Sequence, residues 1–235
     1  MRPLIGIPPV VDAAGRWRPG RDTHYIDGAY ARAVEAAGGA AIYLPVLADG
    51  PALLVRVDGL LLPGGGDFEP PRPYPPGVRF DAVSRPQLDF DTRLLEAALA
   101  GSRPVLGICY GMQLLALHCG GRLVYDIATD LPGALPHRLG DGEGRHELRV
   151  EPGSRLAALL GSGPGPVNSR HHQGVAEPGR GLRVAATAAD GVIEAIEACG
   201  PDAFCLGVQW HPESMDGPHR ERLFAAFVAA CAARP

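Results

Sequence analysis

The stretch VLGICYGMQ, residues 105–113, places a cysteine between two glycines, after an apolar run and before a helix-like segment. A short apolar strand of this kind is typical of a sheet buried between two layers of helices. Gly107 and Gly111 are the small residues that a strained strand-to-helix turn requires around a nucleophile. A helix N-terminus favours the thiolate, so the stretch predicts that Cys109 is a nucleophile.

On both sides of this stretch, short apolar strands alternate with amphipathic helices. Strands are predicted at residues 4–10, 41–46, 59–62, 105–108 and 204–210, and helices at residues 23–37, 52–57, 87–99, 111–118 and 221–233. Beyond residue 120, alternating runs with Gly and Pro turns predict antiparallel strands at 122–127, 147–150, 182–188 and 192–198. The pattern predicts an α/β fold with a mostly parallel sheet and added antiparallel strands.

Length and charge limit the classes of partner. The 235 residues are 46% hydrophobic, and we expect a single domain over residues 1–235. With a net charge of -4 and scattered Lys and Arg, we expect no binding to nucleic acid or to an anionic membrane. The longest apolar stretch, 105–117, falls short of the roughly 18 residues that span a bilayer, and the N-terminus lacks a signal peptide pattern. These features indicate a cytoplasmic protein that acts on a small molecule.

Five widely spaced cysteines without a C-x-x-C motif indicate a reducing compartment rather than a disulfide framework. Except for Cys109, each lies in an apolar run, and we expect these side chains to be small buried hydrophobes: Cys119, Cys199, Cys205 and Cys231.

A second motif, GVQWHPE at residues 207–213, supplies a base for the cysteine. The Gly-x-Cys-x-Gly pattern alone is weak, because 5 cysteines and 32 glycines in 235 residues produce it by chance about once in ten such sequences. His211 and Glu213 are two residues apart after an apolar strand, so they project on the same side of an extended chain. Standing alone, the motif also fits a turn before a helix. Combined with Cys109, it predicts a Cys-His-Glu triad in which Glu213 orients the imidazole.

Two glycine- or histidine-rich loops have more than one interpretation. PGGGD at residues 63–67 fits an oxyanion hole or a flexible turn, and it lacks the Gly-Lys-Ser/Thr of a phosphate loop. In NSRHHQG, residues 168–174, neighbouring histidines point apart and no third ligand recurs at fixed spacing, so we expect substrate contact or structural hydrogen bonds and no metal site. We expect Asp67 and Glu69 to lie in a solvated loop. The Pro-rich segment 70–86 fits a lid or, less well, a polyproline recognition motif.

Together these motifs resemble those of class I glutamine amidotransferases, in the stand-alone peptidase C26-type branch of γ-glutamyl-γ-aminobutyrate hydrolase. The resemblance covers nearly the whole chain, through IGI at 5–7, AGG at 37–39, LPGGGD at 62–67, GICYGMQ at 107–113, NSRHHQ at 168–173 and QWHPE at 209–213. It implies a flavodoxin-like, doubly wound sheet whose nucleophile lies at the carboxyl end of a central strand.

The resemblance also implies roles for individual residues. Cys109 would be the nucleophile, His211 the general acid and base, and Glu213 the group that orients it, while the backbone N–H groups of Gly65 and Tyr110 would form the oxyanion hole. The residues expected to contact substrate are Gly64, Gln113, Ser169, Arg170, His171, His172 and Gln173.

The implied activity is hydrolysis of a γ-glutamyl amide through a cysteine thioester, with no cofactor and no metal. A glutaminase subunit that delivers ammonia to a separate synthetase and a non-catalytic binding protein of the same fold are the alternatives. The identity of the released amine and any homo-oligomeric state stay open at this point.

Overall fold

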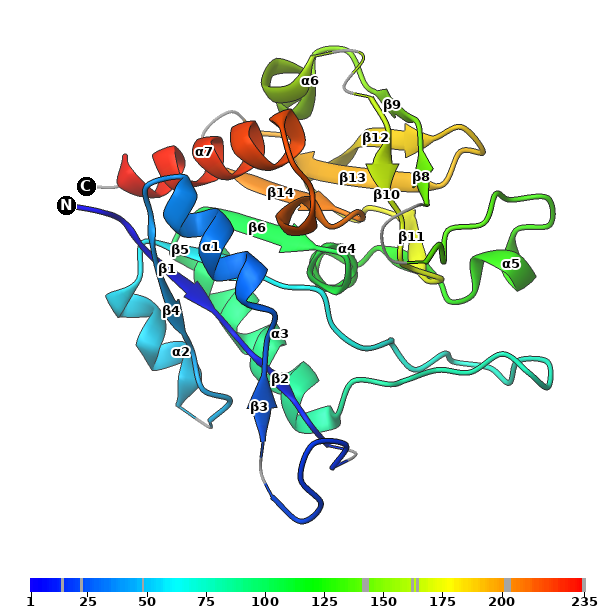
Figure 1. Cartoon of the computed structure of the whole chain (residues 1–235), viewed down its shortest axis with the longest axis horizontal. Helices are drawn as coiled ribbons and strands as arrows, with labels where there is room; N and C mark the ends of the chain where they lie inside the picture. The colour runs from blue at the N-terminus through cyan, green and yellow to red at the C-terminus, as the bar shows by residue number, and fades with distance from the viewer. Residues whose placement is uncertain are drawn as a thin grey trace.

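The computed structural model describes residues 1–235 except 14, 22, 48, 141–143, 162, 164, 201–203 and 234–235. Within the described part, a ten-stranded sheet has the order β4-β1-β5-β6-β14-β13-β11-β7, with β12 on β13 and β9 on β12 (Figure 1). The neighbours from β4 to β14 run parallel, and the strands beyond β14 pair antiparallel. The predicted parallel sheet with added antiparallel strands is therefore confirmed.

The strands of this sheet are short. Its parallel part consists of β1 (Leu4–Ile7), β4 (Ala40–Tyr43), β5 (Gly59–Leu62), β6 (Val105–Ile108) and β14 (Cys205–Val208). The antiparallel part consists of β7 (Arg122–Val124), β9 (Leu148–Val150), β11 (Gly174–Glu177), β12 (Leu182–Ala188) and β13 (Ile193–Ala198). Two separate pairs are β2 (Val10–Val11) with β3 (His24–Tyr25), and β8 (Arg145–His146) with β10 (Val167–Asn168).

Helices cover both faces of the sheet. They are α1 (Gly28–Ala36), α2 (Gly50–Leu53), α3 (Arg85–Ala100), α4 (Tyr110–His118), α5 (Ile127–Asp130), α6 (Arg155–Leu160) and α7 (Pro218–Ala232), with short 3-10 turns η1 (Leu54–Arg56) and η2 (Pro212–Ser214). Helices α1 and α7 pack on one face, and α3 and α4 on the other. No helix in the described ranges is long and apolar enough to cross a membrane.

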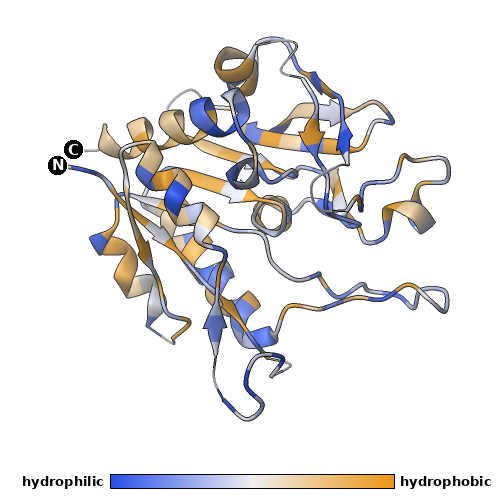
Figure 2. Cartoon of the chain, viewed as in Figure 1, coloured by the Kyte–Doolittle hydropathy of each residue, from blue (hydrophilic) through white to orange (hydrophobic). Residues whose placement is uncertain are grey.

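Strand alternation divides the apolar core between these two faces. Leu61 packs with the residues of α1 and α7, whereas Leu60 and Leu62 pack with those of α3 and α4. Each central strand is apolar on both sides for this reason, and the largely orange colour of β6 in Figure 2 shows its apolar composition. The two buried layers fix the carboxyl ends of β5, β6 and β14 at one edge of the sheet.

Local signals explain where the predicted bounds hold and where they do not. Strands β5, β6 and β12 have the predicted ends. The strand predicted at 4–10 is divided at Pro8 and Pro9, since proline cannot donate to a strand ladder. The helix predicted from residue 23 begins at Gly28, because the Asp27 side chain accepts a hydrogen bond from Ala29 N and caps it.

The cysteine predictions hold in part. All five cysteines are free thiols, and Cys205 and Cys231 are buried as expected. Cys119 is half-buried, and Cys199 is exposed because it follows the end of β13, so the expectation of burial was wrong for Cys199.

Candidate active site

The candidate nucleophile occupies a strained turn at the carboxyl end of β6. Cys109 has φ 51° and ψ -105°, and it immediately precedes α4. Its N–H donates to Val208 O on β14 at 2.8 Å, and its carbonyl accepts from Gln113 N at 3.1 Å. A positive φ costs a non-glycine residue roughly 1–3 kcal/mol and persists only where the surroundings hold it. These two hydrogen bonds and the glycines beside the turn hold Cys109.

Those glycines are required because the backbones pass very close together. A Cβ on Gly107 would lie 2.6 Å from the carbonyl carbon of Gly111, and a Cβ on Gly111 would collide with the carbonyl oxygen of Leu62. A side chain at Gly107 would require β6 to move away from α4, and one at Gly111 would require β5 to move away from α4. The sequence argument that the turn needs small residues is confirmed.

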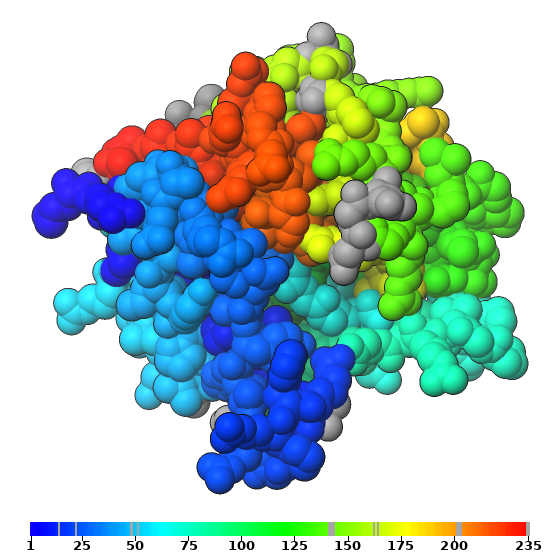
Figure 3. All heavy atoms as spheres, viewed as in Figure 1, coloured from blue at the N-terminus to red at the C-terminus, as the bar shows by residue number. Residues whose placement is uncertain are grey.

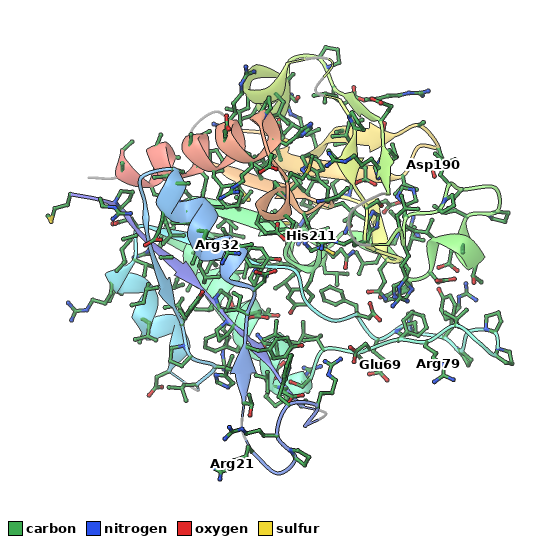
Figure 4. All side chains as sticks on the ribbon, viewed as in Figure 1. Arg21, Arg32, Glu69, Arg79, Asp190 and His211 are labelled. Atoms are coloured by element: carbon green, nitrogen blue, oxygen red, sulfur yellow. The ribbon has the colours of Figure 1, made fainter. Side chains whose placement is uncertain are left out.

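His211 and Glu213 form a hydrogen-bonded pair beside the cysteine. The distance between His211 Nδ1 and Glu213 Oε1 is 2.7 Å, and Glu213 is buried. We had predicted that the pair lies on an extended chain, and this was wrong. Strand β14 ends at Val208, and Glu213 lies in the 3-10 turn η2. The turn, rather than strand alternation, brings the carboxylate to the imidazole. His211 lies centrally in Figure 4.

The backbone of His211 is fixed as firmly as its ring. Asn168 on β10 donates from Nδ2 to His211 O at 2.9 Å and accepts from His211 N at 2.8 Å. One carboxamide therefore satisfies both polar groups of the residue that precedes η2. Asn168 lies in the NSRHHQG motif, but the sequence does not indicate this contact, because Asn168 and His211 are 43 residues apart.

The imidazole is held in its charged form. Burial lowers the pKa of His211, but its interactions with Cys109 and Glu213 outweigh this effect and raise the pKa to about 10. Next to the pair, burial and the nearby Glu213 carboxylate raise the pKa of the Tyr30 hydroxyl. Tyr30 accepts from Gly64 N at 2.9 Å, and a Cβ on Gly64 would lie 2.7 Å from His211 Cε1. A protonated imidazole beside a cysteine is the usual partner of a thiolate nucleophile.

Two backbone N–H groups lie where an oxyanion hole is expected. Tyr110 N is the first N–H of α4, and Gly65 is close enough to Tyr110 that an added Cβ would be 3.1 Å from its ring. Among the described residues, neither N–H donates to a protein acceptor. Both groups are thus available to an oxygen bound beside Cys109.

Cys109 lies between two pockets. The inner pocket, of about 190 Å³, is lined by Gly65, Gly66, Asp67, Asp81, Cys109, Tyr110, Gln113, Arg138, Arg170, His171, His172 and Gln173. The outer pocket, of about 360 Å³, is lined by Val10, Tyr25, Ile26, Asp27, Tyr30, Gly64, Gly65, Cys109, Arg170, His211 and Glu213. Figure 3 shows a hollow on the face turned to the viewer. The blue N-terminal part of the chain and the cyan to turquoise segment 66–83 border it.

The inner pocket carries both signs of charge. Asp67 and Asp81 are its carboxylates, and Arg138 and Arg170 are its guanidinium groups. His172 bridges Asp67 at 2.9 Å and Asp126 at 3.1 Å, and the Asp67 hydrogen bond is the main reason that its pKa is raised. Such a lining suits a small zwitterion.

The loop that follows Gly66 is held by specific contacts. Asp67 accepts from Asp81 N at 2.7 Å and its backbone N–H donates to Asp81 O. We had expected both Asp67 and Glu69 to be solvated loop residues. This was wrong for Asp67, whereas Glu69 is exposed as predicted (Figure 4). Further out, Arg72 and Tyr74 both donate to Asp130 on α5, at 2.6 Å each. These contacts place segment 66–83 beside the inner pocket.

The segment 169–173 does not present every side chain to substrate, because alternate residues point to opposite sides of an extended chain. Arg170 and His172 are half-buried and face the inner pocket. Ser169 is fully buried and donates to His137 O at 2.7 Å, and the ring of His171 faces the buried Glu194. Ser169 lines neither pocket, whereas His171 lines the inner pocket although its Nε2 faces Glu194. Substrate contact by these residues stays a prediction.

The two glutamines predicted at the substrate site support its walls. Gln173 accepts from Phe68 N at 2.8 Å and donates to Phe68 O at 2.9 Å. Gln113 donates from Nε2 to Gln173 O at 3.0 Å and to Gln209 Oε1 at 3.1 Å. Both line the inner pocket, but these hydrogen bonds occupy their carboxamides in part.

Sequence analysis also missed a buried carboxyl below the oxyanion hole. Asp91 on α3 accepts from Tyr110 Oη at 3.0 Å and from Gln87 Nε2 at 2.9 Å. Burial raises the pKa of Asp91 to about 7, although both hydrogen bonds oppose the shift. Its place on the apolar face of a helix is the signal that could have revealed it.

We expect Asp91→Asn to change the pH dependence of stability. The folded protein keeps a proton on Asp91 that the unfolded chain, with an aspartate pKa near 3.9, releases. Stability therefore falls as the pH rises through the interval between these two values, by up to about 3 kcal/mol between pH 5 and pH 8. In urea unfolding, the asparagine variant should gain stability relative to wild type by this amount across that range.

Asp89→Asn is the matched control, because Asp89 lies on the same helix with 46% of its side chain exposed. Its stability difference from wild type should stay constant with pH. The same constant difference for Asp91→Asn would contradict the assignment of a raised pKa.

A group of four side chains away from Cys109 could hold a metal ion: His137, His146, His171 and Glu194. All four are buried. This cluster is separate from the Cys109, His211 and Glu213 group.

The comparisons with known proteins agree with this geometry. The sequence pattern of peptidase C26 matches residues 3–213. The chain belongs to the peptidase C26 family. Among its relatives, γ-glutamyl-γ-aminobutyrate hydrolase PuuD of Escherichia coli K12 is 35% identical over 97% of this chain and 93% of that protein. Protein NtpR of Enterococcus hirae is 32% identical over 91% of this chain and 92% of its own length.

A solved structure shows the same fold. The glutaminase domain of Trypanosoma brucei CTPS, with bound acivicin, has a TM-score of 0.62 at 16% identity and covers 99% of this chain and 94% of that chain. The class I glutamine amidotransferase-like family and the flavodoxin-like fold that the motifs implied are confirmed. Membership of peptidase C26 places the chain among the glutamine amidotransferase-like hydrolases.

Proposed function

We propose that this protein hydrolyses the γ-glutamyl amide bond of a small γ-glutamyl amine through a thioester on Cys109. The observation that carries the proposal is the position of Cys109 between a small pocket with charges of both signs and a larger pocket beside His211. A glutamyl group has an α-amino and an α-carboxylate group, which match the carboxylates and guanidinium groups of the inner pocket. The amine would then occupy the outer pocket.

The first half of the reaction transfers the glutamyl group to the enzyme. The Cys109 thiolate attacks the γ-carbonyl carbon, and the resulting oxyanion accepts hydrogen bonds from Gly65 N and Tyr110 N. Protonated His211 donates its proton to the amide nitrogen, the C–N bond breaks, and the amine leaves. Glu213 keeps the imidazole oriented throughout, through its hydrogen bond to Nδ1.

The second half restores the enzyme. Neutral His211 takes a proton from a water molecule as the oxygen attacks the thioester carbonyl. The same two N–H groups stabilise the second oxyanion, the C–S bond breaks, and glutamate leaves. Cys109 is again a thiolate beside a protonated His211. No step requires an oxidant, a reductant or an organic cofactor.

The contacts of the outer pocket favour γ-glutamyl amines over glutamine. Val10, Ile26 and Tyr25 are lining residues that ammonia, the leaving group of glutamine, cannot reach. An alkyl amine can contact them in the transition state as well as in the bound substrate. The name of PuuD, which acts on γ-glutamyl-γ-aminobutyrate, supports the same substrate class.

A substrate panel tests the proposal. We would measure released glutamate from glutamine and from γ-glutamyl amides of amines with neutral, cationic and anionic tails. At least one γ-glutamyl amine should have a kcat/KM at least about tenfold above that of glutamine, equivalent to one or two buried methylene groups. α-Glutamyl and β-aspartyl amides, which place the carbonyl away from Cys109, serve as matched controls.

Equal turnover of the γ-glutamyl and control amides would contradict the proposed inner pocket. If glutamine is the best substrate and a second protein stimulates its hydrolysis, the chain is a glutaminase subunit. If no amide is hydrolysed and 6-diazo-5-oxonorleucine does not label Cys109, the chain is a binding protein of this fold.

A further inference from the structure

The strongest unexplained feature is a buried cluster at the antiparallel end of the sheet. Four segments contribute to it: His137 from the loop after α5, His146 from β8, His171 from the segment after β10, and Glu194 from β13. One ligand atom from each residue lies within 4.8 Å of all the others. The side chains are between 0% and 6% exposed, so water does not solvate the cluster.

Three imidazole nitrogens converge on one carboxylate oxygen. The distances to Glu194 Oε1 are 3.3 Å from His137 Nδ1, 3.2 Å from His146 Nε2 and 3.4 Å from His171 Nε2. Charge-assisted hydrogen bonds between nitrogen and oxygen are shorter, about 2.7–2.9 Å. In a tetrahedral site with bonds of about 2.0–2.2 Å to zinc, by contrast, neighbouring ligand atoms lie about 3.3–3.5 Å apart. The three observed N···O distances match the edges of such a tetrahedron, and all four ligand atoms lie within 4.8 Å of one another.

Hydrogen bonding inside the cluster is incomplete. In the described part of the chain, His146 Nε2, His171 Nε2 and both oxygens of Glu194 are buried without a hydrogen-bond partner. A buried polar atom that lacks a partner costs about 1–3 kcal/mol, and more when it is charged. His146 Nε2 and His171 Nε2 both face Glu194 Oε1 without a hydrogen bond, which points to a ligand that these atoms share.

The opposite ring nitrogens are already directed outward. His137 Nε2 lies 3.0 Å from Asp190 Oδ2, and His171 Nδ1 lies 2.9 Å from Gln173 O. Since both partners are acceptors, these nitrogens carry the protons, and in the neutral tautomer the nitrogens facing Glu194 have lone pairs. A carboxylate–histidine pair of this kind accompanies most histidine metal ligands.

We propose that His137, His146, His171 and Glu194 bind one Zn²⁺ ion in a closed, tetrahedral, structural site. Three neutral imidazoles and one carboxylate are ligands that zinc accepts, and four protein ligands leave no position open for catalysis. With Asp190 included, two negative charges balance the ion. Figure 4 shows Asp190 in the upper right part of the molecule, away from the central His211.

The site would connect the β8–β10 pair to the large sheet. The β8–β10 pair is outside the large sheet, and His146 on β8 is paired with Val167 on β10. The ion would join this pair to β13 through Glu194. It would also fix His171 beside His172 and Gln173, which line the inner pocket.

Sequence spacing could not reveal this cluster, and we had expected no metal site there. The argument that His171 and His172 point apart holds, since His172 contacts Asp67 and Asp126. The remaining ligands come from positions 137, 146 and 194, which form no recognisable zinc motif in the sequence.

The test uses the full chain and measures bound metal directly. Wild-type protein should retain one Zn²⁺ per chain after dialysis, measured by elemental analysis, and chelation should lower its Tm. After chelation, Co²⁺ should bind with the visible absorption of tetrahedral cobalt, which reports coordination without any mutation.

Substitutions then locate the site. His146→Ala should weaken Zn²⁺ binding at least about 100-fold, and Asp190→Asn, which removes only the partner of a ligand, about 10- to 100-fold. His118→Ala is the matched control, because His118 is a half-buried histidine at the end of α4 outside the cluster. It should bind metal like wild type.

Absence of both retained Zn²⁺ and the tetrahedral Co²⁺ spectrum in folded wild-type protein would overturn the proposal. So would an equal loss of binding in His118→Ala and His146→Ala. Because metal content is measured without substrate, the proposal stands or falls independently of the hydrolase activity.

Discussion

Cys109→Ala is expected to lower the rate of γ-glutamyl amide hydrolysis by at least about 10⁴-fold. Removal of a nucleophile leaves only the rate enhancement due to binding and to the oxyanion hole. The pockets on both sides of Cys109 are lined mainly by other residues, so the variant should still bind intact substrate. Released glutamate measures the first effect, and isothermal titration with a γ-glutamyl amide measures the second.

Cys199→Ala is the control for this experiment. Cys199 is an exposed free thiol that lines neither pocket, and its replacement should leave kcat/KM unchanged. Turnover by Cys109→Ala within a factor of ten of wild type would show that Cys109 is not the nucleophile. Cys109→Ser should lose glutamate release as Cys109→Ala does, because a serine hydroxyl is not ionised near neutral pH.

Glu213→Gln is expected to reduce kcat by about 10³- to 10⁴-fold with little change in substrate binding. A glutamine at this position can donate its amide hydrogen to His211 Nδ1, which stabilises the tautomer with the proton on Nε2. In that tautomer the imidazole cannot accept a proton from the thiol or from water. Steady-state kinetics and substrate titration separate the two effects.

The same variant should also change the pH–rate profile. Glu213 helps Cys109 to raise the pKa of His211 against the effect of burial, so its loss lowers that pKa. Protonated His211 is then lost at lower pH, and the alkaline limb of the profile moves in that direction. Glu221→Gln, an exposed carboxylate in the first turn of α7, is the control and should leave both the rate and the profile unchanged.

If Glu213→Gln keeps wild-type kcat and an unshifted profile, Glu213 does not orient the base. Thermal unfolding of both glutamine variants distinguishes a catalytic loss from an unfolded enzyme. This measurement matters because Glu213 is buried, and replacing a buried carboxylate changes stability as well as chemistry.

Local patterns in the sequence determined the elements around Cys109. Strands β5 and β6 follow from continuous apolar runs. Gly107 is required by the close approach of α4 to β6, and Gly111 by that of α4 to β5. The triad motifs were also readable, because each is a short segment with an unusual combination of residues. Such signals need only neighbours along the chain, and they predicted both the fold class and the candidate nucleophile.

Only the tertiary structure decided which distant side chains meet. Asn168 holds His211 across 43 residues, and His172 meets Asp67 across 105 residues. The inward direction of Ser169 and the convergence of three histidines on Glu194 likewise depend on how β8, β10 and β13 are placed. A single sequence specifies these contacts only through the packing of the whole sheet, because strand order and register arise from long-range burial rather than from local residue preference.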